Sequence, residues 1–205
     1  MVYPVFSYSE DNSDYKVINL QIFPANSLGV SRAIFTNNSA EYVFEFTKPE
    51  YYNFYRDSSL RSCNLLKPLM IVLDGQKYSF VNKIVFSTIN NKSGIKYIEA
   101  ARLDGEGYYK IGNSNFHLLK GTPIEFYPSY KIRSIMLSEI KVLAVGKNSY
   151  EFQSNKMMKF YESGIVWCGY INKPYSILTD GKIVFRKKGE QVWFMETGES
   201  FYTDL

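Results

Sequence analysis

Apolar residues recur along the second half of the chain at an interval of 34 residues. Phe126, Phe160 and Phe194 have this spacing, and a turn-forming segment and a second apolar run follow each of them. A repeated apolar position marks a core face that is used once in each structural unit, and a repeated Gly or Asn marks backbone with positive φ. The other columns with this spacing are Leu103, Leu137, Ile171 and Leu205; Gly121, Asn155 and Gly189; and Gly112, Gly146 and Asp180.

The pattern inside one unit predicts β-hairpins. Around the turn Glu162-Ser163-Gly164, apolar residues alternate with mixed residues on both sides, as in two short antiparallel strands. Phe160 is then expected to face Val166 across the hairpin on the core side. A second hairpin is predicted between successive copies of the first, so that each unit holds about four short strands. The turns of these second hairpins are expected at Gly112, Gly146 and Asp180-Gly181.

Two earlier copies of the unit are less regular. The copy at Phe86 is longer than the others, because Leu103 follows Phe86 by 17 residues instead of the usual 11. Adding three residues to each strand preserves the register, so the tip near Asn90 to Gly94 is predicted to project beyond its neighbours as a contact arm or a passive insertion. The predicted hairpins start at Phe54, Phe86, Phe126, Phe160 and Phe194, and the arm's predicted partner-binding residues are Asn90, Asn91, Lys92 and Ser93.

Residues 1–50 do not fit the repeat. They contain predicted strands from Tyr15 to Phe23 and from Ala33 to Phe46, with prolines as breaks. Repeat arrays need ends that hide an apolar face, so this segment is expected to cap the array, although a separate functional domain is the alternative. No stretch has a sustained helical period. The predicted fold is all-β: a capping segment over 1–50 and a meandering array of antiparallel β-hairpins over 51–205.

The charge and composition of the chain indicate which kinds of partner it is not expected to bind. The formal net charge is only +4, and no basic cluster is longer than Arg186-Lys187-Lys188, so neither nucleic acid nor a membrane surface is the expected partner. Met1 to Tyr8 does not resemble a signal peptide. Cys63 and Cys168 lie at different repeat positions and are not expected to form a disulfide, which favours a reducing compartment. Unless a leader has been removed, a cytoplasmic location is expected.

One peptide carries a resemblance to a known family. Phe160-Tyr161-Glu162-Ser163-Gly164-Ile165-Val166 resembles the Tyr-Tyr-Glu-Asn-Gly-Lys core of MORN-type repeats in their bacterial variant, and also the longer-period repeat proteins of spirochaetes. Phe194-Met195-Glu196-Thr197-Gly198 keeps the pattern, whereas the copy at Phe126 lacks the Gly. The resemblance covers about seven residues per unit, and ordinary MORN units are shorter. It implies a β-hairpin array that contacts protein or lipid, and it implies no catalytic residue.

Few residues of the chain are candidates for catalysis or for binding a metal or cofactor. His117 is the only histidine and occupies an ordinary strand position of the repeat, and no catalytic, cofactor-binding or metal-binding residue is predicted. Aromatic residues make up 17% of the chain, and those next to the repeated Phe positions face the opposite side of the strand. This side is predicted to form an aromatic strip for partner contact, unless the sheet is covered on both faces. The strip consists of Tyr127, Tyr161, Trp167 and Trp193.

Three functions follow, from different classes. The first is a non-enzymatic interaction or structural protein that presents an extended β surface to a protein partner or to a second copy of itself. The second is a small hydrolase or glycan-processing enzyme that gathers carboxylates such as Glu99, Asp104 and Glu106. The third, by analogy alone, is an antitoxin-like or immunity partner. Because repetition builds surfaces and no unique polar constellation is visible, the first is preferred and no cofactor is expected.

Overall fold

The computed structural model describes residues 18–23, 30–37, 40–47, 60–88, 96–179 and 181–201, and these residues contain strands and turns but no helix. The fold is all-β, as predicted. Two compact units can be separated: Met1–Gly105 with Phe126–Tyr130, and Glu106–Glu125 with Lys131–Leu205. The predicted division into a cap over 1–50 and an array over 51–205 stays a prediction.

The first unit contains one main sheet with the order β1-β2-β3-β4-β6-β7, and β5 pairs with β6. The rings of Phe35 and Phe44 pack against Phe86, with centroid distances of 6.4 and 6.3 Å, so the strands before the repeat share its core. The strands are β1 (Ile18–Phe23), β2 (Val30–Asn37), β3 (Ala40–Thr47), β4 (Ser62–Leu65), β5 (Leu69–Leu73), β6 (Gln76–Thr88) and β7 (Lys96–Leu103).

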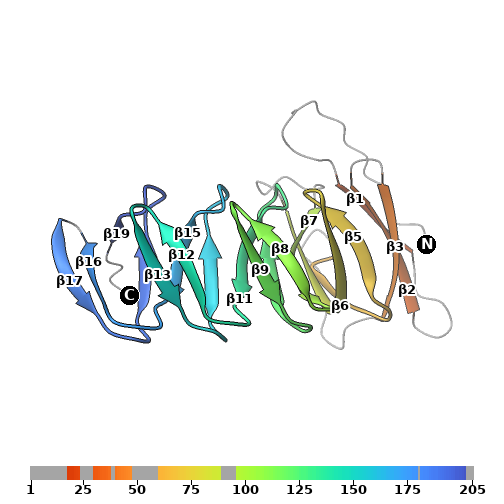
Figure 1. Ribbon diagram of the computed structural model, residues 1–205. Coiled ribbons are helices and arrows are strands. Elements are labelled where there is room, and N and C mark those ends of the chain that lie inside the picture. Colours follow the sequence, from red (N-terminus) through yellow and green to blue (C-terminus); the bar gives the residue numbers. More distant parts are fainter. Residues whose placement is uncertain are drawn as a thin grey trace, which may run out of the picture. The chain divides into compact units, whose positions relative to one another are not determined.

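In the second unit, successive hairpins alternate between two layers. The hairpins β10–β11, β14–β15 and β18–β19 form one sheet, whereas β8–β9 and β12–β13 are separate two-stranded sheets (Figure 1). The last hairpin of the second series, β16–β17, joins the first sheet through the parallel pairing of Thr179 with Ser200, which gives the order β10-β11-β14-β15-β18-β19-β16-β17. The strands are β8 (Gly107–Ile111), β9 (Ser114–Leu118), β10 (Pro123–Phe126), β11 (Ile132–Met136), β12 (Lys141–Val145), β13 (Asn148–Phe152), β14 (Met157–Phe160), β15 (Val166–Tyr170), β16 (Tyr175–Thr179), β17 (Lys182–Arg186), β18 (Gln191–Phe194) and β19 (Ser200–Phe201).

The registers confirm the repeat. Phe160 pairs with Val166, as predicted. The hairpins that alternate with the Phe hairpins share one equivalent cross-strand pair. This pair is Tyr109 with Phe116 in the first, Leu143 with Tyr150 in the second and Ile177 with Val184 in the third. In the longer hairpin Phe86 pairs with Ile98, and the pairs Ser87 with Tyr97 and Thr88 with Lys96 extend it. The six additional residues therefore leave the register intact, as predicted, while the tip itself, with Asn90 to Gly94, lies outside the described residues.

The two layers are joined by aromatic rings. Phe160 packs edge-on against Phe116 with a centroid distance of 5.4 Å, and Phe194 packs against Tyr150 at 5.0 Å, one repeat further on. In the first unit, Phe126 meets Tyr78 edge-on at 5.3 Å. The predicted burial of the repeated Phe positions is confirmed for Phe86, Phe126, Phe160 and Phe194, while Phe54 lies outside the described residues.

The predicted positive-φ column is also confirmed. Gly121, Asn155 and Gly189 have φ values of 81°, 55° and 91° and lie in turns shortly before a strand. The copy without the motif glycine keeps the same backbone, because Tyr130 adopts φ 65° and its N–H donates to the Tyr127 carbonyl at 2.9 Å, as the N–H of Gly164 does to Tyr161. The ring of Tyr130 is buried beside Phe126, which offsets the cost of this backbone conformation.

Glycines hold two pairs of turns in backbone contact. A Cβ built on Gly164 would lie 2.5 Å from the Cα and N of Gly112, and one on Gly198 would lie 2.3 Å from the same atoms of Gly146. Both pairs have the same spacing, and both join a turn of one layer to a turn of the other. Any side chain at these positions would push the layers apart, so the glycine of the Ser163-Gly164 turn is required by packing as well as by its φ of 86°.

We predict that Gly164→Ala destabilises the protein by about 3 kcal/mol or more, because the new methyl group clashes with Gly112 and the alanine must adopt a positive φ. Gly121→Ala is the matched control, because Gly121 also has a positive φ (81°) but no atom lies within 4 Å of the position that a Cβ would take there. The control is expected to cost only about 1–2 kcal/mol. Urea unfolding of both variants measures the difference, and equal losses would contradict the packing role of the Gly112–Gly164 contact.

Phe160→Ala is expected to destabilise the protein by about 3–5 kcal/mol, because it leaves a cavity between the two layers. Phe185→Ala, at an exposed position, is expected to change stability by no more than about 0.5 kcal/mol. Thermal unfolding of the two variants tests the assignment of the inward face. Similar losses in both would mean that Phe160 does not join the layers.

Candidate binding surface

Three aromatic side chains meet on the outer face of the sheet of the second unit. Phe160 points inward, so its two neighbours, Lys159 and Tyr161, point outward. Trp193 is on the same outward side of β18, next to the buried Phe194. Tyr161, Trp167 and Trp193 are each partly exposed. We call these three residues the aromatic cluster.

A β-bulge places Trp167 in the aromatic cluster. Phe160 pairs with Val166, but Lys159 pairs with Cys168, so β15 has one extra residue at this point. Two residues of β15, Trp167 and Cys168, therefore stand opposite Lys159 on the outer face. The pairing of Cys168 with Trp193 then continues the face onto β18.

The rings contact one another in sequence across the strands. Trp167 lies 6.3 Å from Tyr161 and 5.2 Å from Trp193 between ring centroids, the latter nearly perpendicular at 72°. The Nζ of Lys159 lies 5.3 Å from the centre of the Trp167 ring, which is within cation–π range. The Tyr161 hydroxyl donates a hydrogen bond of 2.8 Å to the Phe194 carbonyl. The cluster is therefore fixed in place by the strands before any partner binds.

Burial and nearby acidic groups act on the Tyr161 hydroxyl. Desolvation raises the pKa of Tyr161, and the negative charges that Glu196 and Cys168 carry when ionised raise it further. The phenol is therefore a neutral donor at physiological pH, as its hydrogen bond to the Phe194 carbonyl requires. The cluster thus offers aromatic faces and a lysine ammonium, with Glu196 nearby.

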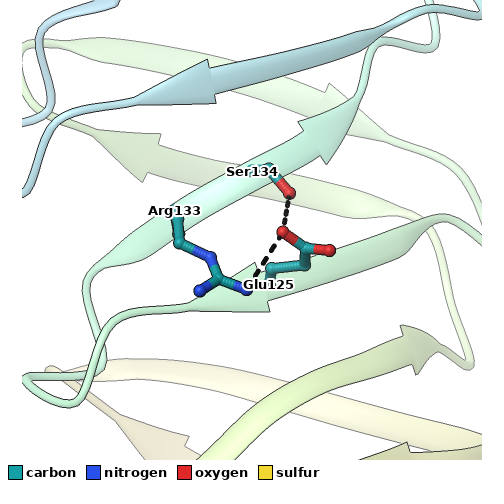
Figure 2. Close-up of polar contacts among 3 residues, drawn as sticks. All are labelled: Glu125, Arg133 and Ser134. Carbon is teal, nitrogen blue, oxygen red and sulfur yellow. Dashed lines mark hydrogen bonds and ion pairs between the residues drawn. The ribbon is translucent and has the colours of Figure 1, made fainter. Parts of the chain in front are cut away.

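The preceding repeat has an ion pair at the equivalent positions. Figure 2 shows Glu125 between Arg133 and Ser134, which both reach its carboxylate. The distances are 3.3 Å from Arg133 Nη2 and 2.7 Å from the Ser134 hydroxyl, both to Oε2 of Glu125. Glu125 and Arg133 are 34 residues before Lys159 and Trp167. The same backbone therefore carries an ion pair in one repeat and a lysine–tryptophan contact in the next.

The other sequence-predicted contact residues belong to the first unit or lie outside the described residues. Tyr127 belongs to the first unit and is partly buried there, so the structure brings together three of the four predicted strip residues. The predicted arm residues Asn90, Asn91, Lys92 and Ser93 lie outside the described residues. Sequence reasoning missed Lys159. Its signal was the alternation around Phe160, which also places Lys159 on the side of Tyr161.

A groove of about 430 Å³ lies on the turn side of the second unit, between the two glycine contacts. Gly112, Gly146 and Gly164 line it, and its polar edge carries Asn113, Ser163 and Glu196. Glu196 is the one carboxylate among the lining residues. The paired carboxylates that a glycosidase uses are therefore not part of this groove.

The titratable residues named for an enzyme occupy ordinary strand and loop positions. Asp104 accepts a 3.5 Å hydrogen bond from the Ser79 hydroxyl, and Glu99 is partly buried in the bulge position of β7. Glu106 is exposed and belongs to the second unit. The His117 ring packs against Tyr108 at 5.0 Å. Across the described part of the chain, no three His, Cys, Asp or Glu residues gather as metal ligands would.

Comparison with known proteins adds no relative. No family model, no curated protein and no solved structure matches the chain. Within the described residues, no helix has the length and apolar character needed to span a membrane.

Both thiols are free and buried. Burial raises the pKa of Cys63 to about 12 and also raises the pKa of Cys168, whose Sγ accepts a 3.4 Å hydrogen bond from Gln191. The protonated thiol is the unreactive form, so neither cysteine has the lowered pKa of a nucleophile. Cys168 lies on the outer face but beneath its neighbours, where it serves as a small apolar residue.

We predict that both thiols resist alkylation at pH 8 in the folded protein and react once it is unfolded in urea. Because the folded pKa of Cys63 is raised above the unfolded value of about 8.5, the unfolded state loses its proton first as pH rises. The free energy of unfolding should therefore fall between pH of about 8.5 and about 12, and less so in Cys63→Ala. Rapid alkylation of the folded protein would contradict the burial of these residues.

Proposed function

We propose that this protein is a non-enzymatic interaction protein and that the aromatic cluster contacts a protein partner. The observation that supports it is the contact of the chain's only two tryptophans, Trp167 and Trp193, at 5.2 Å on a partly exposed sheet face. Tryptophan, tyrosine and cationic side chains dominate the energy of protein interfaces, and rings held by strands lose little entropy on binding.

The neighbouring repeat supports a specific role for the cluster. If the fold alone required aromatic residues on this face, the equivalent positions should also be aromatic. The position equivalent to Tyr161 is the aromatic Tyr127, but the position equivalent to Trp167 carries Arg133, which pairs with Glu125 (Figure 2). The ion pair is only partly exposed, and ion pairs near the surface contribute about 0–1 kcal/mol to stability. The array therefore tolerates either chemistry here, so the rings are available for recognition.

The sequence motif and the free thiols support the type of repeat array and the cellular compartment that we propose. The resemblance of residues 160–166 to MORN-type repeats agrees with a hairpin array used for contact. The two free thiols agree with a reducing compartment, and we infer a cytoplasmic location from them. The hydrolase hypothesis lacks a supporting carboxylate pair in the described groove, and the immunity-partner hypothesis remains an analogy.

The neighbouring repeat also supplies the test. In the double variant Lys159→Glu, Trp167→Arg, the contact between Lys159 and Trp167 is replaced by the ion pair that the fold already accommodates at Glu125 and Arg133. Recovery of partners from the native cell, quantified against wild type, is expected to fall at least tenfold, because interface hot spots contribute about 2 kcal/mol or more. The melting temperature is expected to change by only a few degrees.

The control is the reverse exchange, Glu125→Lys with Arg133→Trp, which is expected to leave partner recovery unchanged. The two tryptophans also give a direct signal, since quenching or a wavelength shift of their fluorescence should accompany partner binding. Equal recovery by the wild type and by a folded Lys159→Glu, Trp167→Arg variant would refute the proposal.

A further inference from the structure

Strand β17 differs in polarity from the strands at the equivalent positions of the preceding hairpins, although the inward residues Ile177 and Thr179 of its partner β16 remain buried. In β9 and β13 the inward positions are buried and apolar, with Phe116 and Leu118 in one and Tyr150 and Phe152 in the other. The equivalent inward positions of β17 are Val184, which is only half-buried, and Arg186. The side chain of Arg186 is 16% exposed and reaches Glu190 at 4.0 Å. A charge therefore stands where the other hairpins have core.

The outward face of the same hairpin is apolar. Ile183 is 79% exposed and Phe185 is 62% exposed, and Leu178, the cross-strand neighbour of Ile183, is 54% exposed. At the positions equivalent to Ile183 and Phe185, β13 carries Ser149 and Glu151. This hairpin thus exposes three large apolar side chains at one end of its sheet.

The edge of β17 is open for hydrogen bonding. Among the described residues β17 pairs only with β16, at the end of the strand order (Figure 1). Thr179 pairs with Lys182, and two residues separate them in the sequence, so this is the first hydrogen-bonded pair and Ile177 with Val184 is the next. The backbone N–H and C=O groups of Ile183 and Phe185 then point away from β16. The residues that expose apolar side chains thus also present their backbone groups to an incoming strand.

Lysines flank this edge. Lys182 precedes the open segment, Lys187 and Lys188 follow it, and all three are exposed. Antiparallel pairing of β17 with a second copy, centred on Val184, would set Lys182 opposite Arg186, and like charges placed opposite each other destabilise a sheet. The hydrocarbon region of a membrane offers no partner for the outward backbone groups. An acidic strand satisfies the charges and the backbone together.

We propose that β17 is a docking edge for an extended acidic peptide segment that adds to the sheet as one more strand. Alternate residues of the incoming strand are apolar and cover Leu178, Ile183 and Phe185, and the residues between them are Asp or Glu, paired with the flanking lysines. This surface is distinct from the aromatic cluster, in which Trp167 and Trp193 lie on β15 and β18 and Tyr161 directly follows β14.

The test uses three fluorescein-labelled ten-residue peptides and the full chain, measured by fluorescence anisotropy. The first peptide alternates Val and Glu, the second has the same composition in two blocks, and the third alternates Val and Lys. The alternating acidic peptide is expected to bind at least tenfold more tightly than the other two, and to weaken as salt is raised. Failure of the alternating acidic peptide to bind, or equal binding of the block peptide, would overturn the proposal.

Variants separate side-chain, backbone and charge contributions. Ile183→Ser with Phe185→Glu installs the residues that β13 already carries, and is expected to weaken binding at least tenfold. Phe185→Pro removes an outward N–H but leaves the hydrogen bonds to β16, and is expected to weaken binding similarly, whereas Phe185→Leu should retain it. Lys187→Glu with Lys188→Glu, in an exposed turn, preserves the fold and should abolish the preference for Glu over Lys peptides.

Two further results would assign this edge to another occupant. Binding to vesicles containing phosphatidylserine that is lost in Ile183→Ser, Phe185→Glu but unaffected by Phe185→Pro would indicate a lipid surface. A dimer in light scattering that the same double variant dissociates would indicate a second copy of the chain. Either result overturns the peptide proposal. The variant Lys159→Glu, Trp167→Arg should bind the acidic peptide normally, so this surface and the aromatic cluster are tested separately.

Discussion

The contact that the rest of the repeat depends on is the packing of an aromatic ring of one layer against an aromatic ring of the other. Strands of four or five residues bury too little surface to be stable as isolated hairpins. Phe116 against Phe160, and Tyr150 against Phe194, join a separate hairpin to a hairpin of the sheet. The hairpins β8–β9 and β12–β13 are therefore stabilised by later parts of the chain, as in other repeat proteins, where stability arises between neighbouring units.

The glycine contacts follow from this packing. Once the rings set the distance between the layers, the turns at Gly112 and Gly164, and those at Gly146 and Gly198, meet backbone to backbone. The hairpin β5–β6 turns at Asp74-Gly75, and nothing lies within 4 Å of the Cβ position of Gly75. The first position of this turn is Asp74, which is exposed and adopts a φ of 46°, so a turn whose first residue faces solvent can carry a side chain there.

The outer faces are free of these constraints, and this is where the repeats differ. One hairpin carries an ion pair between Glu125 and Arg133, and the next carries the lysine and tryptophan of the aromatic cluster. The hairpin β16–β17 carries large apolar side chains, Ile183 and Phe185, at exposed positions. A repeated core with variable faces allows one array to present several unlike surfaces, which fits an interaction protein better than a single catalytic centre.

The sequence by itself determined the strands, their registers and the inward face, because the spacing of Phe, Gly and Asn reflects local backbone conformation and burial. It predicted the pairing of Phe160 with Val166 and the intact register of the longer hairpin at Phe86. Only the tertiary structure decided that alternate hairpins enter different layers, that a bulge places Trp167 beside Trp193, and that Gly112 meets Gly164. These are contacts between segments distant in sequence, and a one-dimensional period specifies each hairpin without specifying which other hairpin it packs against.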